Sequence, residues 1–209
     1  MRKILIYFVL LIFICFAIPI IFTSNFSKKV SSDKVVENIV ENNIEYNYEK
    51  YGTVKLLHKD TGKIEEIDID EYLYGVVSAE MPASFEEEAL KAQAVVARTY
   101  TIYKIINNED KHGEANICDD STCCQAWISE EDRKEKWNEE ERESYWEKIV
   151  SAVNSTKGEI ITYEGKPINA FFHSNSGGAT EAPVDVWGGS GYPYLQSVTT
   201  AGEDAYSQY

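Results

Sequence analysis

The sequence predicts an α+β fold, with mixed helices and antiparallel hairpins in one exterior domain that is carried on a single N-terminal transmembrane helix. Three observations lead to this prediction. Residues 4–22 form an uncharged apolar run of about the length that crosses a bilayer core. Residues 53–69 alternate around an Asp/Gly turn, which is typical of a hairpin. Residues 85–107 contain the longest helical pattern in the chain.

The N-terminal segment is interpreted as a membrane anchor. Residues 1–3 are expected to be the cytoplasmic end, although Lys28 and Lys29 on the other flank weaken the charge bias. A cleaved signal peptide is the alternative, but the apolar run of residues 4–22 is longer than a usual signal-peptide core, and no clear small-x-small cleavage site follows it. We therefore expect a single-pass membrane protein, with the rest of the chain on the outer side of the membrane.

The charge of the exterior part argues against nucleic acid as a partner. The chain has 35 acidic and 20 basic residues, and four of the basic ones lie before residue 30; the remainder, 35 acidic against 16 basic, carries a net charge of −19. Such a surface repels nucleic acid and anionic lipid. Residues 23–52 are polar and rich in Asn and Glu, which indicates a stalk, and the folded domain is expected over residues 53–209.

The first predicted helix ends in a carboxylate. Asp70 is expected to cap a helix over residues 71–81, and one face of this helix is apolar up to Glu80. That face consists of Leu73, Val76, Val77 and Glu80. A carboxylate held beside apolar groups is desolvated, which is how a general acid is made. The alternative is an exposed glutamate in a frayed last turn.

The second predicted helix runs from residue 85 to about residue 107, after Pro82 has stopped the first. Few of its side chains are strongly polar, so most of its circumference must be covered by protein and Arg98 is expected to be at least half buried. A buried guanidinium needs a carboxylate, backbone carbonyls or a polar ligand as its partner. The alternative is an Arg98 side chain whose head reaches water.

A loop after this helix contains four residues of the types that zinc prefers. Within thirteen residues it carries His112, Cys118, Cys123 and Cys124. Three exterior cysteines cannot all pair within one chain, so a structural zinc site is the first interpretation; a disulfide or free thiols are the alternatives. A full shell of protein ligands leaves no open position, so the ion would hold the loop rather than activate water. For His112, an exposed loop histidine is the alternative.

A strongly charged helix over residues 131–156, capped by Ser129 and Asp132, is interpreted as a solvated lid or flank. The hairpin predicted over residues 159–173 leads into a polar loop. Its exposed polar groups are candidates to bind a polar ligand. They are His173, Ser174, Asn175, Ser176 and Gly177. Trp187, Tyr192 and Tyr194 are either apolar faces for a ligand or core.

Three separated motifs carry a resemblance to a known family. The stretches AEMPASFEEEALKAQAVVARTY, CDDSTCCQAW and FFHSNSGGATE follow in this order, and together they resemble the SpoIID/LytB family over roughly residues 53–209. The resemblance implies a lytic transglycosylase of peptidoglycan, whose catalytic glutamate is the one in the EMP motif, Glu80. It also implies that Arg98, in ARTY, supports activity by steadying developing charge or by orienting Glu80.

The resemblance implies a sugar ligand for the polar loop as well. For a glycan strand, the groups of residues 173–177 are candidates to bind sugar hydroxyls and N-acetyl groups. Trp187, Tyr192 and Tyr194 would then offer apolar faces to pyranose rings, unless they belong to the core.

The resemblance further implies where the protein acts. The family works during engulfment in spore-forming bacteria, alongside stage II sporulation proteins P and M, and favours glycan strands stripped of stem peptides. Its members run on past the position of Tyr209, so the domain of residues 53–209 is expected to be incomplete at its C-terminus. The family often has His where Cys123 stands, and because zinc accepts either residue the difference supports metal binding.

Two other functions stay open. One is a non-catalytic glycan-binding scaffold akin to the amidase enhancers of the same family. The presence of Glu80 together with Arg98 argues against this function. The other is a zinc hydrolase. Four protein ligands argue against this function, because a zinc ion with four protein ligands has no open position for water.

Overall fold

The structure, a computed structural model, describes residues 48–107 and 111–200. The predicted transmembrane segment, residues 4–22, and nearly all of the predicted stalk lie outside the described residues. All described residues belong to one compact unit of the chain. Among the helices of these described ranges, none combines the length and the apolar character that a membrane span needs.

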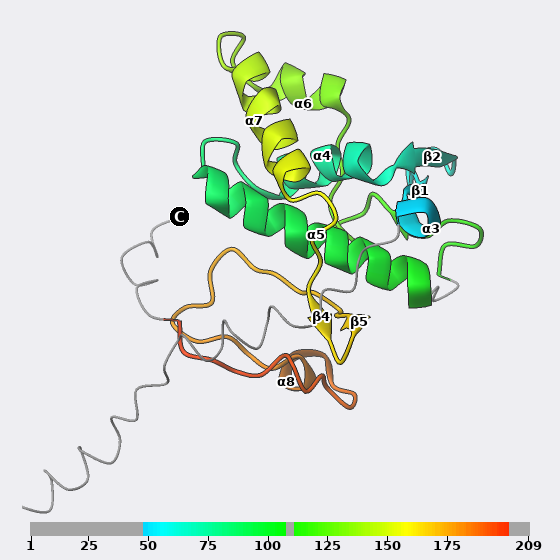
Figure 1. The fold of residues 1–209 in the computed structure, drawn as a ribbon, viewed down its shortest axis with the longest axis vertical. Helices are drawn as coiled ribbons and strands as arrows, with labels where there is room; N and C mark the ends of the chain where they lie inside the picture. Colours follow the sequence, from blue (N-terminus) through cyan, green and yellow to red (C-terminus); the bar gives the residue numbers. More distant parts are fainter. Residues whose placement is uncertain (1–47, 108–110, 201–209) are drawn as a thin grey trace, which may run out of the picture. The chain divides into compact units, whose positions relative to one another are not determined.

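The described part is a mixed α/β domain of helices and small sheets (Figure 1). In chain order its elements are α3 (Tyr48–Tyr51), β1 (Thr53–Leu57), β2 (Ile64–Asp68), α4 (Ile69–Glu80), α5 (Glu87–Asn107), β3 (Ile117–Cys118), α6 (Glu130–Lys136), α7 (Arg142–Ser155), β4 (Thr162–Tyr163), β5 (Lys166–Pro167) and α8 (Pro183–Trp187). The predicted combination of helices and hairpins is therefore confirmed for this part of the chain.

The larger sheet places Cys118 beside the first hairpin. Its strand order is β2-β1-β3. β1 and β2 form the predicted antiparallel hairpin, with Thr53 opposite Asp68 and Leu57 opposite Ile64. β3 instead pairs with β1 in parallel, and sets Cys118 opposite Leu57. The sheet is thus mixed rather than purely antiparallel, a difference that the sequence could not show because a two-residue strand has no alternating pattern.

Helices α4, α5 and α7 enclose the main apolar core (Figure 1). The apolar face predicted for α4 is buried, with Leu73, Val76 and Val77 at 0 % exposure. Ala94 and Ala97 of α5 are also fully buried, and their small side chains let neighbouring helices approach closely. Packing therefore fixes the turns of α4 that precede Glu80.

The start of α4 differs from the prediction. The helix begins at Ile69, and its cap is Asp68, whose carboxylate accepts hydrogen bonds from the amides of Asp70 (2.8 Å) and Glu71 (3.4 Å). Asp70 is not the cap. Its side chain is buried in the first turn, where it meets Arg98 instead.

The predicted charged helix over residues 131–156 is two helices. α6 ends before Trp137, whose backbone is extended (φ −97°, ψ 155°), and the chain turns before α7 begins. The ring of Trp137 packs edge-on against Tyr145 of α7, with centroids 5.5 Å apart. Partial burial of this aromatic pair against the core outweighs the helical preference of the charged sequence between the two rings.

The predicted hairpin over residues 159–173 is shorter than expected, because β4 and β5 have two residues each. Side chains that alternate along a strand would point Ile168 and Ala170 to one face and Asn169 to the other. Ile168 and Ala170 are buried, at 8 % and 2 % exposure, but Asn169 between them is buried too. Phe172 is exposed. The alternation therefore fails beyond β5, where no ladder is present to maintain it.

Candidate functional site

Glu80 lies where α4 ends and the chain turns away. It is the last residue of the helix, and Met81 continues in an extended conformation (φ −134°, ψ 136°) before Pro82. Its side chain is half-buried, and Oε1 accepts a hydrogen bond of 2.7 Å from the backbone amide of Ala126. The carboxylate is thus oriented by the protein, with one oxygen engaged by a backbone donor.

The segment that supplies this amide crosses between α4 and α5. Gln125, which precedes Ala126, is 1 % exposed. Its Nε2 donates to Thr101 Oγ1 on α5 (3.1 Å) and to Tyr72 Oη on α4 (3.4 Å). Gln125 therefore ties the segment to both helices next to the Ala126 amide.

Gly75, in the middle of α4, lets the same segment approach the helix. A Cβ at this position would lie 2.6 Å from Trp127 Cδ1 and 2.7 Å from the carbonyl oxygen of Ile128. Gly75 is not among the predicted site residues, although a glycine inside a helix costs roughly 1 kcal/mol relative to Ala and so indicates a close approach. The sequence gives no indication of the role of Ala126, because Ala126 bonds Glu80 through its backbone amide, which every non-proline residue has.

Arg98 is fully buried and is bonded to the ends of two other helices. Its exposed fraction is 0 %, so the alternative of a head in water is wrong. Nη2 donates to Asp70 Oδ1 (3.4 Å) and to the Val153 carbonyl (3.0 Å), and Nη1 donates to the Thr156 carbonyl (2.8 Å). These are the carboxylate and carbonyl partners that a buried guanidinium needs.

The hydrogen bonds of Arg98 lie at the other end of α4 from Glu80. Asp70 is in the first turn of this helix and Glu80 is its last residue. At 1.5 Å per residue the two are about 15 Å apart along the axis. Arg98 therefore joins α5 to the start of α4 and the end of α7, and a side chain with no exposed surface does not touch a glycan at the surface.

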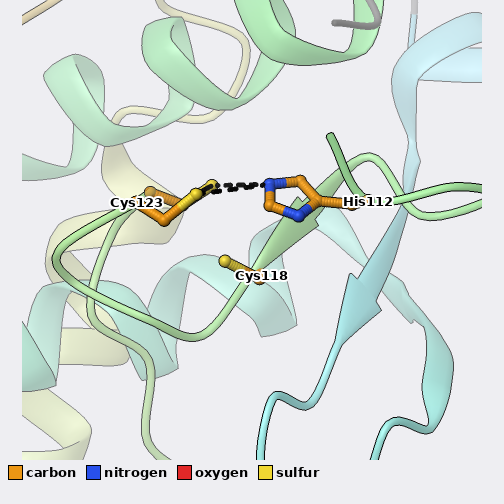
Figure 2. A group of neighbouring side chains, drawn as sticks. His112, Cys118 and Cys123 are labelled. Carbon is orange, nitrogen blue, oxygen red and sulfur yellow. Dashed lines mark hydrogen bonds between the residues drawn. The ribbon is translucent and has the colours of Figure 1, made fainter. Parts of the chain in front are cut away.

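The loop between α5 and α6 brings together the four predicted metal ligands, His112, Cys118, Cys123 and Cys124, whose donor atoms all lie within 4.8 Å of one another (Figure 2). His112 Nε2 is 3.3 Å from Cys124 Sγ and 3.7 Å from Cys123 Sγ, and these two sulfurs are 3.9 Å apart. Sulfurs bound to one tetrahedral zinc at about 2.3 Å are about 3.8 Å apart. The spacing fits a zinc ion, and the adjacent cysteines both reach the cluster.

The chemistry of the donors also fits a metal. Burial, with smaller contributions from three nearby lysines, lowers the pKa of His112, which keeps the imidazole neutral with a lone pair to give. Cys118, Cys123 and Cys124 are free thiols, so the structure does not contain the alternative disulfide. Burial raises the pKa of Cys118 and raises that of Cys124 to about 12, so a cation must displace the thiol protons as it binds.

The predicted sugar-binding residues, His173, Ser174, Asn175, Ser176 and Gly177, occupy a loop on the surface. A turn organises it, in which the Gly177 amide, at φ 71°, donates to Asn175 Oδ1 (2.7 Å). The hydroxyls of Ser176 and Thr200 are 2.5 Å apart. None of the hydrogen bonds among the described residues joins this loop to Glu80, and its part in binding sugars stays a prediction.

Trp187, Tyr192 and Tyr194 were predicted to be either exposed aromatic faces or core, and they differ in this respect. Trp187 is 68 % exposed and its ring lies 5.0 Å from that of Phe171, so it is not core. Tyr192 and Tyr194 are half-buried, and their hydroxyls accept hydrogen bonds from Asn169 Nδ2 (2.8 Å) and the Asn169 amide (3.1 Å). The tyrosines therefore hold the loop structure, and Trp187 keeps a free face.

Comparison with known proteins supports the motif resemblance. A family model, SpoIID, described as stage II sporulation protein, matches residues 57–163, about half of the chain. This chain belongs to the SpoIID family. The matched range includes Glu80, Arg98 and the whole Cys/His cluster, so the family region coincides with the geometry described above. Membership in the SpoIID family also sets this protein in a sporulation context.

Curated relatives agree with the SpoIID assignment. Stage II sporulation protein D of Bacillus amyloliquefaciens is 36 % identical over 158 residues, which are 75 % of this chain and 45 % of the relative. The protein of the same name from Bacillus subtilis is 39 % identical over 147 residues, 70 % of this chain and 42 % of the relative. An amidase enhancer of Bacillus subtilis is 38 % identical over 123 residues, 59 % of this chain and 14 % of the relative. The chain thus spans less than half the length of these relatives.

Proposed function

We propose that this chain is a membrane-anchored lytic transglycosylase that cleaves peptidoglycan glycan strands during sporulation and leaves 1,6-anhydro-muramic ends. The observation that carries the proposal is the oriented, half-buried carboxylate of Glu80 at the end of α4 in a member of the SpoIID family. A glycosidase that activates water normally needs two carboxylates that flank the bond. A lytic transglycosylase needs only one such carboxyl group, and the backbone donor of Ala126 orients that of Glu80.

One carboxyl group is enough because the attacking oxygen belongs to the substrate. The protonated Glu80 gives its proton to the glycosidic oxygen as the bond between that oxygen and C1 breaks. The carboxylate then takes the proton of the muramic C6 hydroxyl, whose oxygen forms the new bond to C1. The proton given by Glu80 stays on the hydroxyl of the departing sugar, the proton of the C6 hydroxyl replaces it on Glu80, and no water is consumed.

Mass spectrometry of glycan strands digested with the full chain tests this proposal. Strands without stem peptides are the expected substrate, and their fragments should carry anhydro-muramic ends. New reducing ends would instead indicate a hydrolase. A second candidate is a non-catalytic glycan-binding scaffold or amidase enhancer, which the similarity to the Bacillus subtilis amidase enhancer favours. Uncleaved strands that remain bound to the protein would support that candidate.

The setting of the reaction is part of the proposal. We place residues 4–22 in the cell membrane, the catalytic domain on its outer side, and stage II sporulation proteins P and M as partners at engulfment. The loop of residues 173–177 and the free face of Trp187 are proposed to contact the glycan, because both are exposed and offer polar groups and an aromatic surface.

We also propose a structural zinc ion held by the Cys/His cluster, and its removal should lower stability and activity together. At a zinc concentration 100-fold above its Kd, binding stabilises the fold by about 2.7 kcal/mol. For a domain of this size that corresponds to roughly 5–10 °C in melting temperature. Thermal unfolding and glycan cleavage, measured before chelation, after chelation and after zinc is added back, check this expectation.

Serine variants of the three cysteines test how much each proposed zinc ligand contributes to stability and activity. Cys118→Ser and Cys124→Ser should mimic chelation, because these sulfurs are buried or half-buried in the cluster. Cys123→Ser should be milder, because Cys123 is exposed and its sulfur lies farther from His112 Nε2 (3.7 Å) than that of Cys124 (3.3 Å). Elemental analysis of the purified protein that showed no zinc, together with a disulfide between Cys118 and Cys124, would contradict the zinc site.

A further inference from the structure

The Cys/His cluster is connected to Glu80 through a very short stretch of chain. Cys124 is the last cluster residue, and the Ala126 amide that bonds Glu80 Oε1 lies two residues after it. Two residues span at most about 7 Å when fully extended. A change in the position of Cys124 is therefore transmitted to the donor of Glu80 unless the chain between them bends.

The start of this stretch is fixed by the loop that carries the sulfurs. The carbonyl of Asp120 accepts hydrogen bonds from the amides of Cys123 (3.0 Å) and Cys124 (2.8 Å). Cys118 belongs to β3, which pairs with β1 of the sheet. An ion held by Cys118 and Cys124 at once would thus tie the beginning of residues 125–128 to the sheet.

The end of this stretch is fixed by packing on Trp127. One side of its ring lies against Gly75 in α4, where no side chain could fit. His58 also contacts the ring edge-on, at 5.4 Å between centroids, and its Nδ1 lies 3.2 Å from a carboxylate oxygen of Asp119. Asp119 follows Cys118 directly, so the contacts of Trp127 lead back to the cluster.

We propose that residues 125–128 are a positioning segment that couples metal binding at the Cys/His cluster to the orientation of Glu80. The inference rests on the proposed role of Glu80. With the Ala126 amide on Oε1, the acidic proton is carried by Oε2, and the same amide stabilises the carboxylate once the proton has left. Ala126 and Gly75 are therefore positioning residues, which act on the reaction without touching the glycan.

Amide hydrogen exchange tests the coupling without substrate or turnover. In the full chain loaded with zinc, the Ala126 amide should exchange slowly, and chelation or Cys124→Ser should speed its exchange at least about tenfold at temperatures where the protein stays folded. Amides in the middle of α5, around Ala94, serve as the internal control and should keep their rates. Unchanged exchange at Ala126 after the metal is removed would overturn the proposal.

Exchange in Glu80 variants tests the hydrogen bond itself. Glu80→Gln keeps an oxygen that can accept from the Ala126 amide, so protection should persist. Glu80→Ala removes the acceptor, and exchange at Ala126 should rise while zinc content stays at the parent value. Equal protection in both variants would show that the amide is not held by Glu80.

Removal of the donor tests its effect on the reaction. Ala126→Pro has no amide hydrogen, and turnover should fall by about 10- to 100-fold with KM and zinc content near the parent values. Ala126→Gly keeps the amide and serves as the matched control, with turnover expected within a few-fold of the parent. Parental turnover in a folded, zinc-loaded Ala126→Pro variant would overturn the proposal.

Gly75→Ala provides a second variant if the proline variant does not fold. Its methyl group would displace Trp127 and the backbone at Ile128, so kcat should fall while zinc content is kept. Unchanged kcat and unchanged exchange at Ala126 would overturn the positioning role. A parent protein that makes no anhydro ends would refute the proposed function, whereas the exchange measurements would still decide the coupling.

Discussion

Glu80→Gln should abolish the release of anhydro-ended fragments while the fold and glycan binding persist. The amide of Gln can neither protonate the glycosidic oxygen nor take up the proton of the C6 hydroxyl, so both steps are lost together. A fall of about 10⁴-fold or more is expected, because one group serves as acid and then as base. Mass spectrometry of digested strands measures the products, and a pull-down with the same strands measures binding.

Glu71→Gln is the matched control for this experiment. Glu71 lies on the same helix as Glu80 but is exposed in its first turn, so its loss of charge should leave cleavage at the parent rate. Glu80→Gln should keep the parent fold, because the side-chain oxygen of the glutamine can still accept a hydrogen bond from the Ala126 amide. Fragments with anhydro ends from the Glu80→Gln variant at near the parent rate would remove Glu80 from the mechanism.

Arg98→Ala should destabilise the domain by about 3–5 kcal/mol, the usual effect of breaking a buried ion pair. The change leaves the Asp70 carboxylate with Lys157 as its remaining ion-pair partner, at 3.0 Å from Oδ2. It also removes the donor from the carbonyls of Val153 and Thr156 at the end of α7. The melting temperature should fall by roughly 6–20 °C, which thermal unfolding measures.

The same variant tests whether Arg98 acts on the reaction beyond stability. Well below the melting temperature, cleavage per folded molecule should stay within about tenfold of the parent, because the bonds of Arg98 lie at the start of α4. Arg98→Lys should restore little stability, since one ammonium cannot reach all the partners of a planar guanidinium. Lys91→Ala, which removes surface ion pairs from the same helix, should leave the melting temperature almost unchanged. A far larger loss of cleavage in folded Arg98→Ala would assign Arg98 a direct part in the site.

Predictions from the spacing of apolar residues were confirmed where they depended on a single helix. The period of the apolar residues located α4 and α5, and it placed Glu80 at the end of the face that contains Val76. The same reasoning failed at residues 131–156 and at Asp70, because helix ends depend on tertiary contacts as well as on period. At Trp137 the contact with Tyr145 ended α6, and at Asp70 the contact with Arg98 placed the side chain inside.

By itself the sequence determined the chemical groups that are available. It supplied a carboxylate at a helix end, an arginine on a buried helix and four ligands of the types that zinc prefers, because these depend on residue type and spacing along the chain. Only the tertiary structure decided which groups meet. It set Arg98 on Asp70 rather than near Glu80, and the Ala126 amide on Glu80. Residues that lie 28 and 46 positions apart meet through packing of helices and loops, and no local pattern encodes such packing.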